Sequence, residues 1–184
     1  MAKTAVLERS PVNAGKRFAN EVVMIEAAPP ASRISLRATG VGITNFGKRL
    51  GFALPKKPHQ TNGKDGRTAL WLGPDEWLVI DTRRVDETMV PKLSNKTVAA
   101  IDISHRNTAF IITGTGAENT LNVACPRDLS ETAFPVGTCS RTIFGKAEVV
   151  LWRTGKDTFH LECWRSFASY VWRYLLEGAK DAHV

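Results

Sequence analysis

The chain has 184 residues, of which 43% are hydrophobic and 23% charged, a composition typical of a folded globular domain rather than a disordered chain. Its net charge of +7 is spread along the sequence without a dense basic stripe, so we expect no nucleic-acid partner, although docking to an acidic partner and simple solubility both remain open. No apolar run approaches the roughly 18 residues of a membrane helix. With no recognisable secretory signal and three widely spaced cysteines, the chain is expected in the cytoplasm, without a disulfide framework, a zinc site or a membrane contact.

The first 31 residues carry no sustained helical or alternating pattern, which predicts an extended N-terminal arm over residues 1–31. Its one apolar patch, Val22 to Ile25, is a candidate for a short added strand. Such an arm either packs back on its own domain or lies on another subunit, and the sequence does not decide between these alternatives.

From Ser32 the pattern becomes regular and predicts a strand followed by a helix. Residues 34–37 alternate in polarity as a half-buried strand does. After Thr39-Gly40, an apolar stripe at helical spacing ends near Gly51. The residues of this stripe are Ile43, Phe46, Gly47 and Leu50.

Residues 70–80 predict a hairpin, because two apolar, tryptophan-bearing strands flank a Gly-Pro-Asp-Glu turn. We expect Trp71 and Trp77 to anchor the core. A second helical stripe follows, in which Pro91 delays the start of the helix or kinks it. Its apolar residues are Val85, Met89, Val90 and Leu93.

The second half repeats this order of elements. A strand over 97–103 and a fully apolar strand over 109–112 precede Thr113-Gly114 and a short helix that stops at Pro126. Residues 150–161 then repeat the strand, polar turn and strand of the first hairpin. The last helix has the most regular apolar stripe: Trp164, Phe167, Ala168, Val171, Trp172, Leu175, Leu176 and Ala179.

The recurrence predicts a duplicated unit with a period of about 75 to 80 residues, judged from Thr39 to Thr113 and from Trp71 to Trp152. We therefore predict an α+β fold with two pseudo-repeated strand–helix–hairpin–helix lobes, whose antiparallel sheets are covered by helices. One two-lobed domain is expected over residues 32–184, with lobe one at about 32–96 and lobe two at about 97–184.

Few residue patterns suit catalysis. Ser104 and His105 are adjacent, so their side chains diverge on an extended segment, and the sequence has no Gly-x-Ser-x-Gly turn. Gly114-Thr115-Gly116 lacks the third glycine of a dinucleotide-binding loop, and a strand-to-helix turn explains it. The four histidines have no metal-ligand spacing.

Three local groups remain as candidates, each with a structural alternative. Asp102 to Arg106 crowds polar side chains into a turn, where Asp102 can accept backbone hydrogen bonds. Cys125 to Leu129 is interpreted first as a helix stop with an Arg127–Asp128 pair. Glu148 lies in an apolar strand, where burial would raise its pKa, but alternation places it equally well on the outward face.

Six segments together carry a resemblance to known proteins. They are Ile101-Asp102-Ile103-Ser104-His105, Thr113-Gly114, Cys125-Pro126-Arg127-Asp128-Leu129, Phe134-Pro135-Val136-Gly137, Leu70-Trp71-Leu72-Gly73-Pro74-Asp75-Glu76-Trp77 and Arg165-Ser166-Phe167-Ala168. The first four resemble the folate-binding domain of the glycine-cleavage T-protein. With the last two, the chain is similar over roughly residues 32–180 to the gamma subunit of heterotetrameric sarcosine oxidase.

The resemblance implies a two-lobed fold and a complex that oxidises sarcosine with oxygen. Its products would be glycine, hydrogen peroxide and, with tetrahydrofolate, the methylene derivative of that cofactor. In that family, FAD, FMN, NAD, tetrahydrofolate and zinc belong to the alpha, beta and delta subunits. This chain is therefore expected to bind those subunits and to hold no cofactor, metal or catalytic residue itself.

The same resemblance bears on Glu148. The T-protein family places an acidic pair in the strand matched by residues 144–149, where this chain has only Glu148 beside Ala147. We therefore expect a non-catalytic subunit that organises its partners. The alternatives are a free-standing folate-binding protein resembling an aminomethyltransferase and, on charge alone, an RNA-contacting relative.

Overall fold

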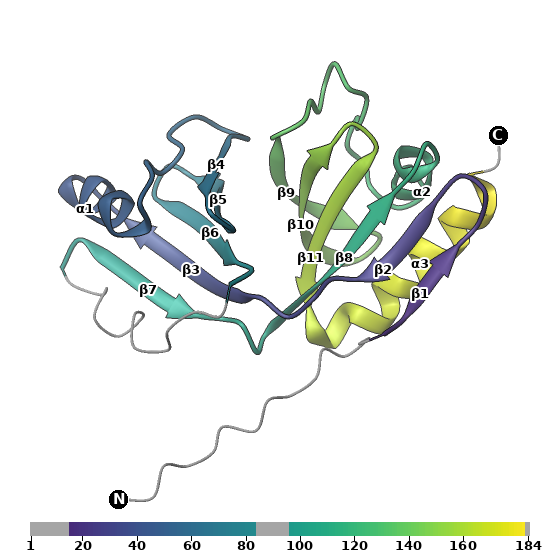
Figure 1. Ribbon diagram of the computed structural model, residues 1–184, viewed down its shortest axis with the longest axis horizontal. Coiled ribbons are helices and arrows are strands. Elements are labelled where there is room, and N and C mark those ends of the chain that lie inside the picture. The colour runs from purple at the N-terminus through teal and green to yellow at the C-terminus, as the bar shows by residue number, and fades with distance from the viewer. Residues whose placement is uncertain (1–14, 84–95, 183–184) are drawn as a thin grey trace, which may run out of the picture.

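The computed structural model describes residues 15–83 and 96–182, which form two lobes side by side (Figure 1). Each lobe is an antiparallel sheet whose outer face is covered by helix, one described helix in lobe one and two in lobe two, and the inner faces of the two sheets meet. The five strands of lobe one are, in spatial order, β4 (Thr61–Lys64), β5 (Arg67–Gly73), β6 (Glu76–Asp81), β3 (Ser32–Ala38) and β7 (Val98–Asp102). The six strands of lobe two are β1 (Arg17–Ala19), β2 (Met24–Ala27), β8 (Asn107–Thr113), β11 (Thr158–Trp164), β10 (Ala147–Gly155) and β9 (Cys139–Phe144).

The predicted duplication is confirmed by the order of the strands. Lobe one reads β4-β5-β6-β3-β7, and lobe two reads β9-β10-β11-β8-β2 with β1 added at the edge. Each repeat begins with a strand that crosses to the other lobe, because β2 precedes β3 but pairs with β8, whereas β7 precedes β8 but pairs with β3. The lobe boundary expected near residue 96 would assign β7 to lobe two. In the structure β7 pairs with β3 and therefore belongs to the sheet of lobe one.

The N-terminal residues that the structure describes form a hairpin rather than an extended arm. β1 pairs with β2, and β2 pairs with β8 from Met24 opposite Thr113 to Ala27 opposite Phe110. Ile25 is completely buried in the core of lobe two. Of the two placements left open by the sequence, this part of the chain packs on its own domain, since its apolar side chains complete that core.

Both predicted hairpins are present, and they share an irregularity. The register shifts between Trp71 and Gly73 in the first hairpin and between Arg153 and Gly155 in the second. Trp71 is thus equivalent to Arg153 and not to Trp152, which corrects the pairing used to estimate the repeat. Because one residue along a strand changes the face, Trp71 packs on the core of lobe one and Trp152 between the lobes.

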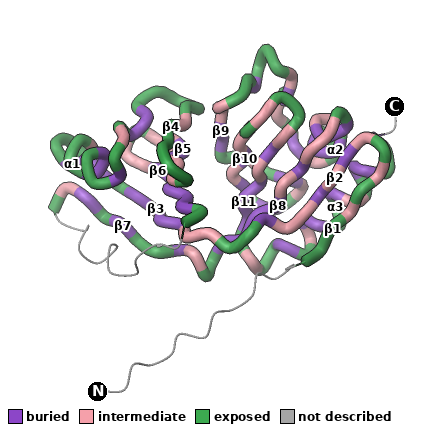
Figure 2. Tube along the Cα trace, in the orientation of Figure 1, coloured by how far each residue is buried: buried purple, intermediate pink, exposed green. Residues whose placement is uncertain are grey.

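Three apolar clusters hold the fold together, and Figure 2 shows the buried residues concentrated along the strands. The first lies under α2 (Ala117–Asn122) and α3 (Ala168–Asp181) in lobe two, and the second lies under α1 (Val41–Leu50) in lobe one. The third joins the inner faces of the two sheets, and we call it the interlobe seam. Its residues are Leu70, Leu78, Ile80, Ile103 and Cys139, with Ala31, Leu72, Val150 and Trp152 packed against them.

The helices follow the apolar stripes with one correction. α1 (Val41–Leu50) ends where Gly51 adopts a left-handed conformation, and α2 (Ala117–Asn122) is short. α3 (Ala168–Asp181) is preceded by the 3-10 turn η1 (Arg165–Phe167). Trp164 and Phe167 therefore lie before the helix and are 41% and 37% exposed, contrary to their expected place on its buried stripe.

Two further expectations concern helices. The stripe of Val85, Met89, Val90 and Leu93 lies outside the described residues. None of the helices in the described part of the chain is long and apolar enough to cross a membrane.

Candidate functional site

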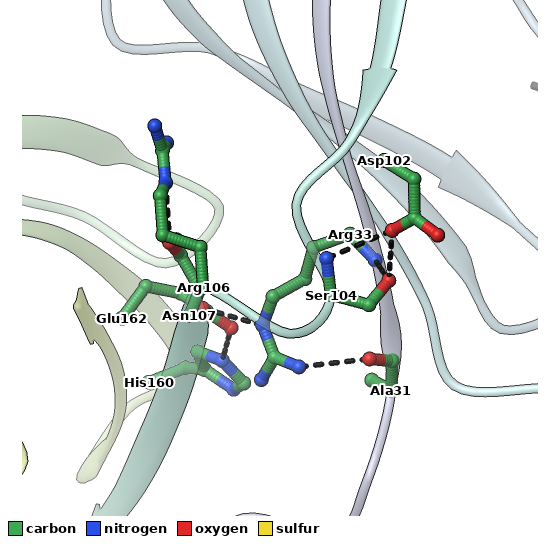
Figure 3. A network of polar contacts seen from close by, with 8 residues as sticks. All are labelled: Ala31, Arg33, Asp102, Ser104, Arg106, Asn107, His160 and Glu162. Carbon is green, nitrogen blue, oxygen red and sulfur yellow. Dashed lines mark hydrogen bonds and ion pairs between the residues drawn. The ribbon is translucent and has the colours of Figure 1, made fainter. Parts of the chain in front are cut away.

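A buried group of charged side chains joins the lobes beside the interlobe seam (Figure 3). Arg33 on β3 donates from Nε to Oε2 of Glu162 on β11 at 2.6 Å, and His160 Nε2 lies 2.8 Å from Oε1 of the same carboxylate. The side chains of Arg33 and Glu162 are only 4% and 1% exposed. Arg33 also donates from Nη1 to the carbonyl oxygen of Ala31 at 2.8 Å. One carboxylate is thus held from both lobes.

Strand alternation explains why these residues meet. On β3, Ile34 and Leu36 face the core of lobe one, so Arg33 faces the other lobe. On β11, Leu161 and Cys163 face the core of lobe two, so Glu162 faces back toward Arg33.

Glu162 is ionised despite its burial. Burial by itself would raise the pKa of this carboxyl, but the hydrogen bond from His160 and the positive charge of Arg33 together hold the pKa below its ordinary value. This carboxylate has a partner on each oxygen, one of them from the other lobe, and the group forms an ionic connection between the sheets.

The Asp102–Arg106 segment forms the rigid turn expected of it. Asp102 Oδ1 accepts hydrogen bonds from both the backbone N–H and the hydroxyl of Ser104. The Ser104 hydroxyl oxygen in turn accepts the N–H of Arg33 at 2.9 Å, as Figure 3 shows. The turn therefore supports the strand that carries Arg33. The Ser104 hydroxyl donates to Asp102 and not to the neighbouring His105.

A second ionic contact spans the lobes nearer the surface. Glu76 at the start of β6 accepts Arg37 from β3 at 3.0 Å and also pairs with Arg141 from β9 in the other lobe. Arg37 makes a further contact with Asp75 at 3.2 Å. These groups are more exposed than Arg33 and Glu162, so solvent weakens their interactions.

The far end of the seam is joined by backbone contacts. Gln60 and Thr138 form an isolated bridge, and the N–H of Cys139 donates to the carbonyl of His59 at 2.8 Å. His59 has a positive φ of 66°, which is uncommon for a residue other than glycine. Its ring is held from the other lobe, with Nδ1 at 3.1 Å from the Cys139 carbonyl oxygen and Nε2 at 3.3 Å from Arg127 Nη2.

This arrangement corrects the interpretation of Cys125 to Leu129. Arg127 contacts His59 and lies over the ring of Phe134, and no ion pair joins it to Asp128 among the described residues. Asp128 instead accepts the N–H of Ser130, and this hydrogen bond lowers the pKa of Asp128.

The remaining candidates are Glu148 and the turn at Gly114 to Gly116. Glu148 is exposed on β10, whereas Ala147 beside it is buried in the core of lobe two, so Glu148 lies on the strand face that borders the seam and not in that core. Gly114 and Gly116 make room for the N-terminal hairpin: the N–H of Gly116 donates to the carbonyl of Val22 at 2.9 Å, and a Cβ on Gly114 would lie 2.3 Å from that oxygen. The described histidines, cysteines and carboxylates form no group of three that could hold a metal ion.

Little space remains beside the charged groups of the seam. The cavity bordered by Glu76, Arg106, Glu148 and Glu162 has a volume of about 50 Å³, whereas pockets that hold cofactors or substrates measure roughly 300–1,000 Å³. Burial raises the pKa of the Cys139 thiol in the seam to about 12, so this thiol stays protonated and is a poor nucleophile. Two larger hollows, of about 550 and 490 Å³, lie away from these charged groups.

Sequence reasoning missed Arg33, His160 and Glu162. The only local signal is a charged residue between apolar residues of a strand. Such a residue also occurs on the solvent-facing side of a strand, so the signal does not identify a buried ion pair. Pairing between residues 129 positions apart is not visible in a single sequence.

The architecture is that of the folate-binding domain of T-proteins. A solved structure of the glycine cleavage system aminomethyltransferase T from Bartonella henselae matches 83% of this chain with a TM-score of 0.56 at 12% identity, over 45% of that protein. This likeness establishes a shared fold.

Within this class, a profile of the sarcosine oxidase, gamma subunit family matches residues 43–181, and the chain belongs to that family. The sarcosine oxidase subunit gamma of an Arthrobacter species is 29% identical over 168 residues, which cover 89% of this chain and 82% of that protein. The heterotetrameric sarcosine oxidase from Corynebacterium sp. U-96, solved in complex with pyrrole 2-carboxylate, contains a chain that matches with a TM-score of 0.84 and 24% identity. The match covers 97% of this chain and 98% of that one.

Proposed function

We propose that this chain is the gamma subunit of a heterotetrameric sarcosine oxidase and that its role in the complex is structural. The complex would oxidise sarcosine to glycine with formation of hydrogen peroxide and methylene-tetrahydrofolate, and this chain would brace the subunits that react. Family membership and coverage of nearly the whole length of a related chain support the assignment.

The observation that carries the structural role is the filled seam. In a two-lobed domain, the space between the lobes is a favoured place for a ligand. Here apolar side chains, the Arg33–Glu162 pair and the Glu76–Arg141 contact fill the part of this space beside the charged groups and leave about 50 Å³ there, and the hollow of about 550 Å³ lies at the His59 end. A pterin does not fit the cavity beside Glu162, so we derive no chemical step through tetrahydrofolate at these charged groups.

The proposed partners are the alpha, beta and delta subunits, which would carry FAD, FMN, NAD, tetrahydrofolate and zinc. A cytoplasmic complex fits the three buried cysteines, all of which are unpaired thiols.

Co-expression tests the assignment. The chain, carrying an affinity tag, is expressed with and without alpha, beta and delta subunits from the same source, and purified material is assayed for sarcosine-dependent hydrogen peroxide. We expect the four subunits to copurify, with no activity from the tagged chain alone. A chain that stays separate from those subunits contradicts the proposal.

Calorimetry distinguishes the alternative of a free-standing folate-binding, aminomethyltransferase-like protein. Titration of the isolated chain with tetrahydrofolate is expected to give no binding heat. Measurable binding that Glu148→Ala weakens would favour the alternative, because Glu148 borders the small cavity.

A further inference from the structure

Two hollows border the segment 51–62 of lobe one and share part of their lining. The first, about 550 Å³, lies between the segment 53–62 and residues 136–138 of lobe two. The second, about 490 Å³, lies between α1 and the segment 51–56. Ala53, Leu54 and Lys56 border both hollows. We call their combined lining the α1 face.

The charge of the α1 face has one sign. Lys48 and Lys56 border it, and neither forms an ion pair with a described carboxylate. No aspartate or glutamate is present in the lining of either hollow. Such a surface attracts carboxylates and repels other basic surfaces.

The face also offers apolar contacts. Ile43 and Phe52 are only partly buried against the core of lobe one, and both border the second hollow. Val136 is 51% exposed at the edge of the first. An apolar recess flanked by lysines suits a protein segment with an apolar side chain between carboxylates, whereas a nucleic-acid backbone makes no use of such a recess.

The first hollow has fixed walls. The bridge between Gln60 and Thr138, and the 2.8 Å hydrogen bond from the Thr61 hydroxyl to the Gly137 carbonyl, tie its two sides together across the lobes. A preorganised surface loses less conformational entropy on binding than a mobile loop.

We propose that the α1 face is the docking surface for an acidic segment of another subunit of the complex, with an apolar side chain in the recess beside α1 and carboxylates opposite Lys48 and Lys56. The inference rests on the proposed function and adds the location and chemistry of one contact. The proposed contact lies on lobe one, whose sheet has fewer strands than that of lobe two, and it matches the partner in both charge and shape.

The test compares two charge reversals in the co-expressed complex. K48E/K56E alters the α1 face, and K146E/R173E makes the same change in charge at exposed residues of lobe two. We expect K48E/K56E to weaken assembly by about tenfold or more, with an effect that diminishes at high salt, and K146E/R173E to leave assembly near the parental level. Equal assembly of the two variants overturns the proposal.

A steric variant tests the recess independently of charge. Thr44 is exposed and borders the second hollow, so Thr44→Trp fills the recess without changing the net charge. Circular dichroism of the isolated variants checks that each folds. We expect T44W to weaken assembly in both low and high salt, and parental assembly by T44W counts against the apolar contact.

Two other outcomes are informative. If the parental chain does not copurify with the other subunits, the proposed function fails and the docking surface with it. If K48E/K56E assembles normally but loses affinity for a generic single-stranded RNA in filter binding, the α1 face is a nucleic-acid surface and the proposal is overturned.

Discussion

The Arg33–Glu162 pair illustrates what one buried ionic contact does in this protein. Removing two charges from water costs several kcal/mol per ion, and good geometry with further hydrogen bonds is needed to offset that cost. Here the carboxylate has partners on both oxygens, and the guanidinium also binds the Ala31 carbonyl. Two apolar side chains could stabilise the seam equally well, so the pair mainly specifies how the two sheets are placed.

At this scale, Glu162→Gln should lower the free energy of unfolding by about 3 kcal/mol, because it leaves the buried Arg33 charge without its partner. Urea unfolding followed by circular dichroism measures the change. The control is Glu177→Gln on α3, whose contact with Lys180 is largely exposed and whose removal should leave stability unchanged. Equal stability of E162Q and the parent contradicts the role given to the pair.

The same residue predicts a dependence on pH. Its pKa in the folded state is below the ordinary value, so its stabilising contribution is present above about pH 4.3 and is lost as the pH falls through the folded-state pKa. The stability difference between the parent and E162Q should therefore be largest near neutral pH and decrease toward pH 3. Urea midpoints between pH 3 and 7 test this, and a difference independent of pH would be inconsistent with an ionised Glu162.

At the scale of elements, α2 and α3 approach closely through a glycine. A Cβ on Gly178 would lie 2.3 Å from the Thr120 carbonyl oxygen, which is backbone and cannot rotate away. Glycine normally weakens a helix. In α3 it lets the helix lie directly on α2.

Gly178→Ala should therefore destabilise the protein by roughly 1–3 kcal/mol, the cost typical of overpacking, although the same change in an exposed helix stabilises by about 1 kcal/mol. Ser169→Ala on the exposed face of α3 is the matched control and should be neutral or slightly stabilising. Thermal melts of both variants measure the effect. A more stable G178A would show that the helices can separate without loss.

Sequence periodicity predicted the elements well and their assembly less well. The stripe ending at Gly51 and both hairpins follow from local patterns, which depend on neighbouring residues only. The pairing of Trp71 with Trp152 was wrong by one residue, because the register shift that both hairpins contain makes Trp71 equivalent to Arg153, and one sequence does not reveal this shift. The candidate turn at Asp102 was predicted correctly, since its hydrogen bonds are local, whereas Glu162 was missed because its partner is distant.

For the whole molecule, the exchange of β2 and β7 couples the lobes. Ile25 on β2 belongs to the core of lobe two, but the chain continues directly into β3 of lobe one. The same is true in the other direction for β7 and β8. Unfolding of either sheet therefore disturbs the other lobe, because each sheet contains one strand that continues directly into the other sheet.

Ile25→Ala should consequently destabilise both lobes, by about 2–4 kcal/mol from the cavity that it leaves. Hydrogen exchange at neutral pH tests the coupling: amides of β5 and β6 in lobe one should exchange faster, as should those of β8 and β11 in lobe two. Faster exchange confined to lobe two would mean that the lobes open independently.

The strand exchange also has a consequence for a half-length polypeptide. A single repeat, β2 through β6, contains four strands of one sheet and one strand that belongs to the other sheet. On its own it lacks the strand that pairs with the free edge of β3. Two such copies could each donate the first strand to the other and close both sheets, which is the geometry of a domain-swapped homodimer. Fusing the genes of the two copies would yield the present topology, in which a linker joins the end of the first copy to the start of the second.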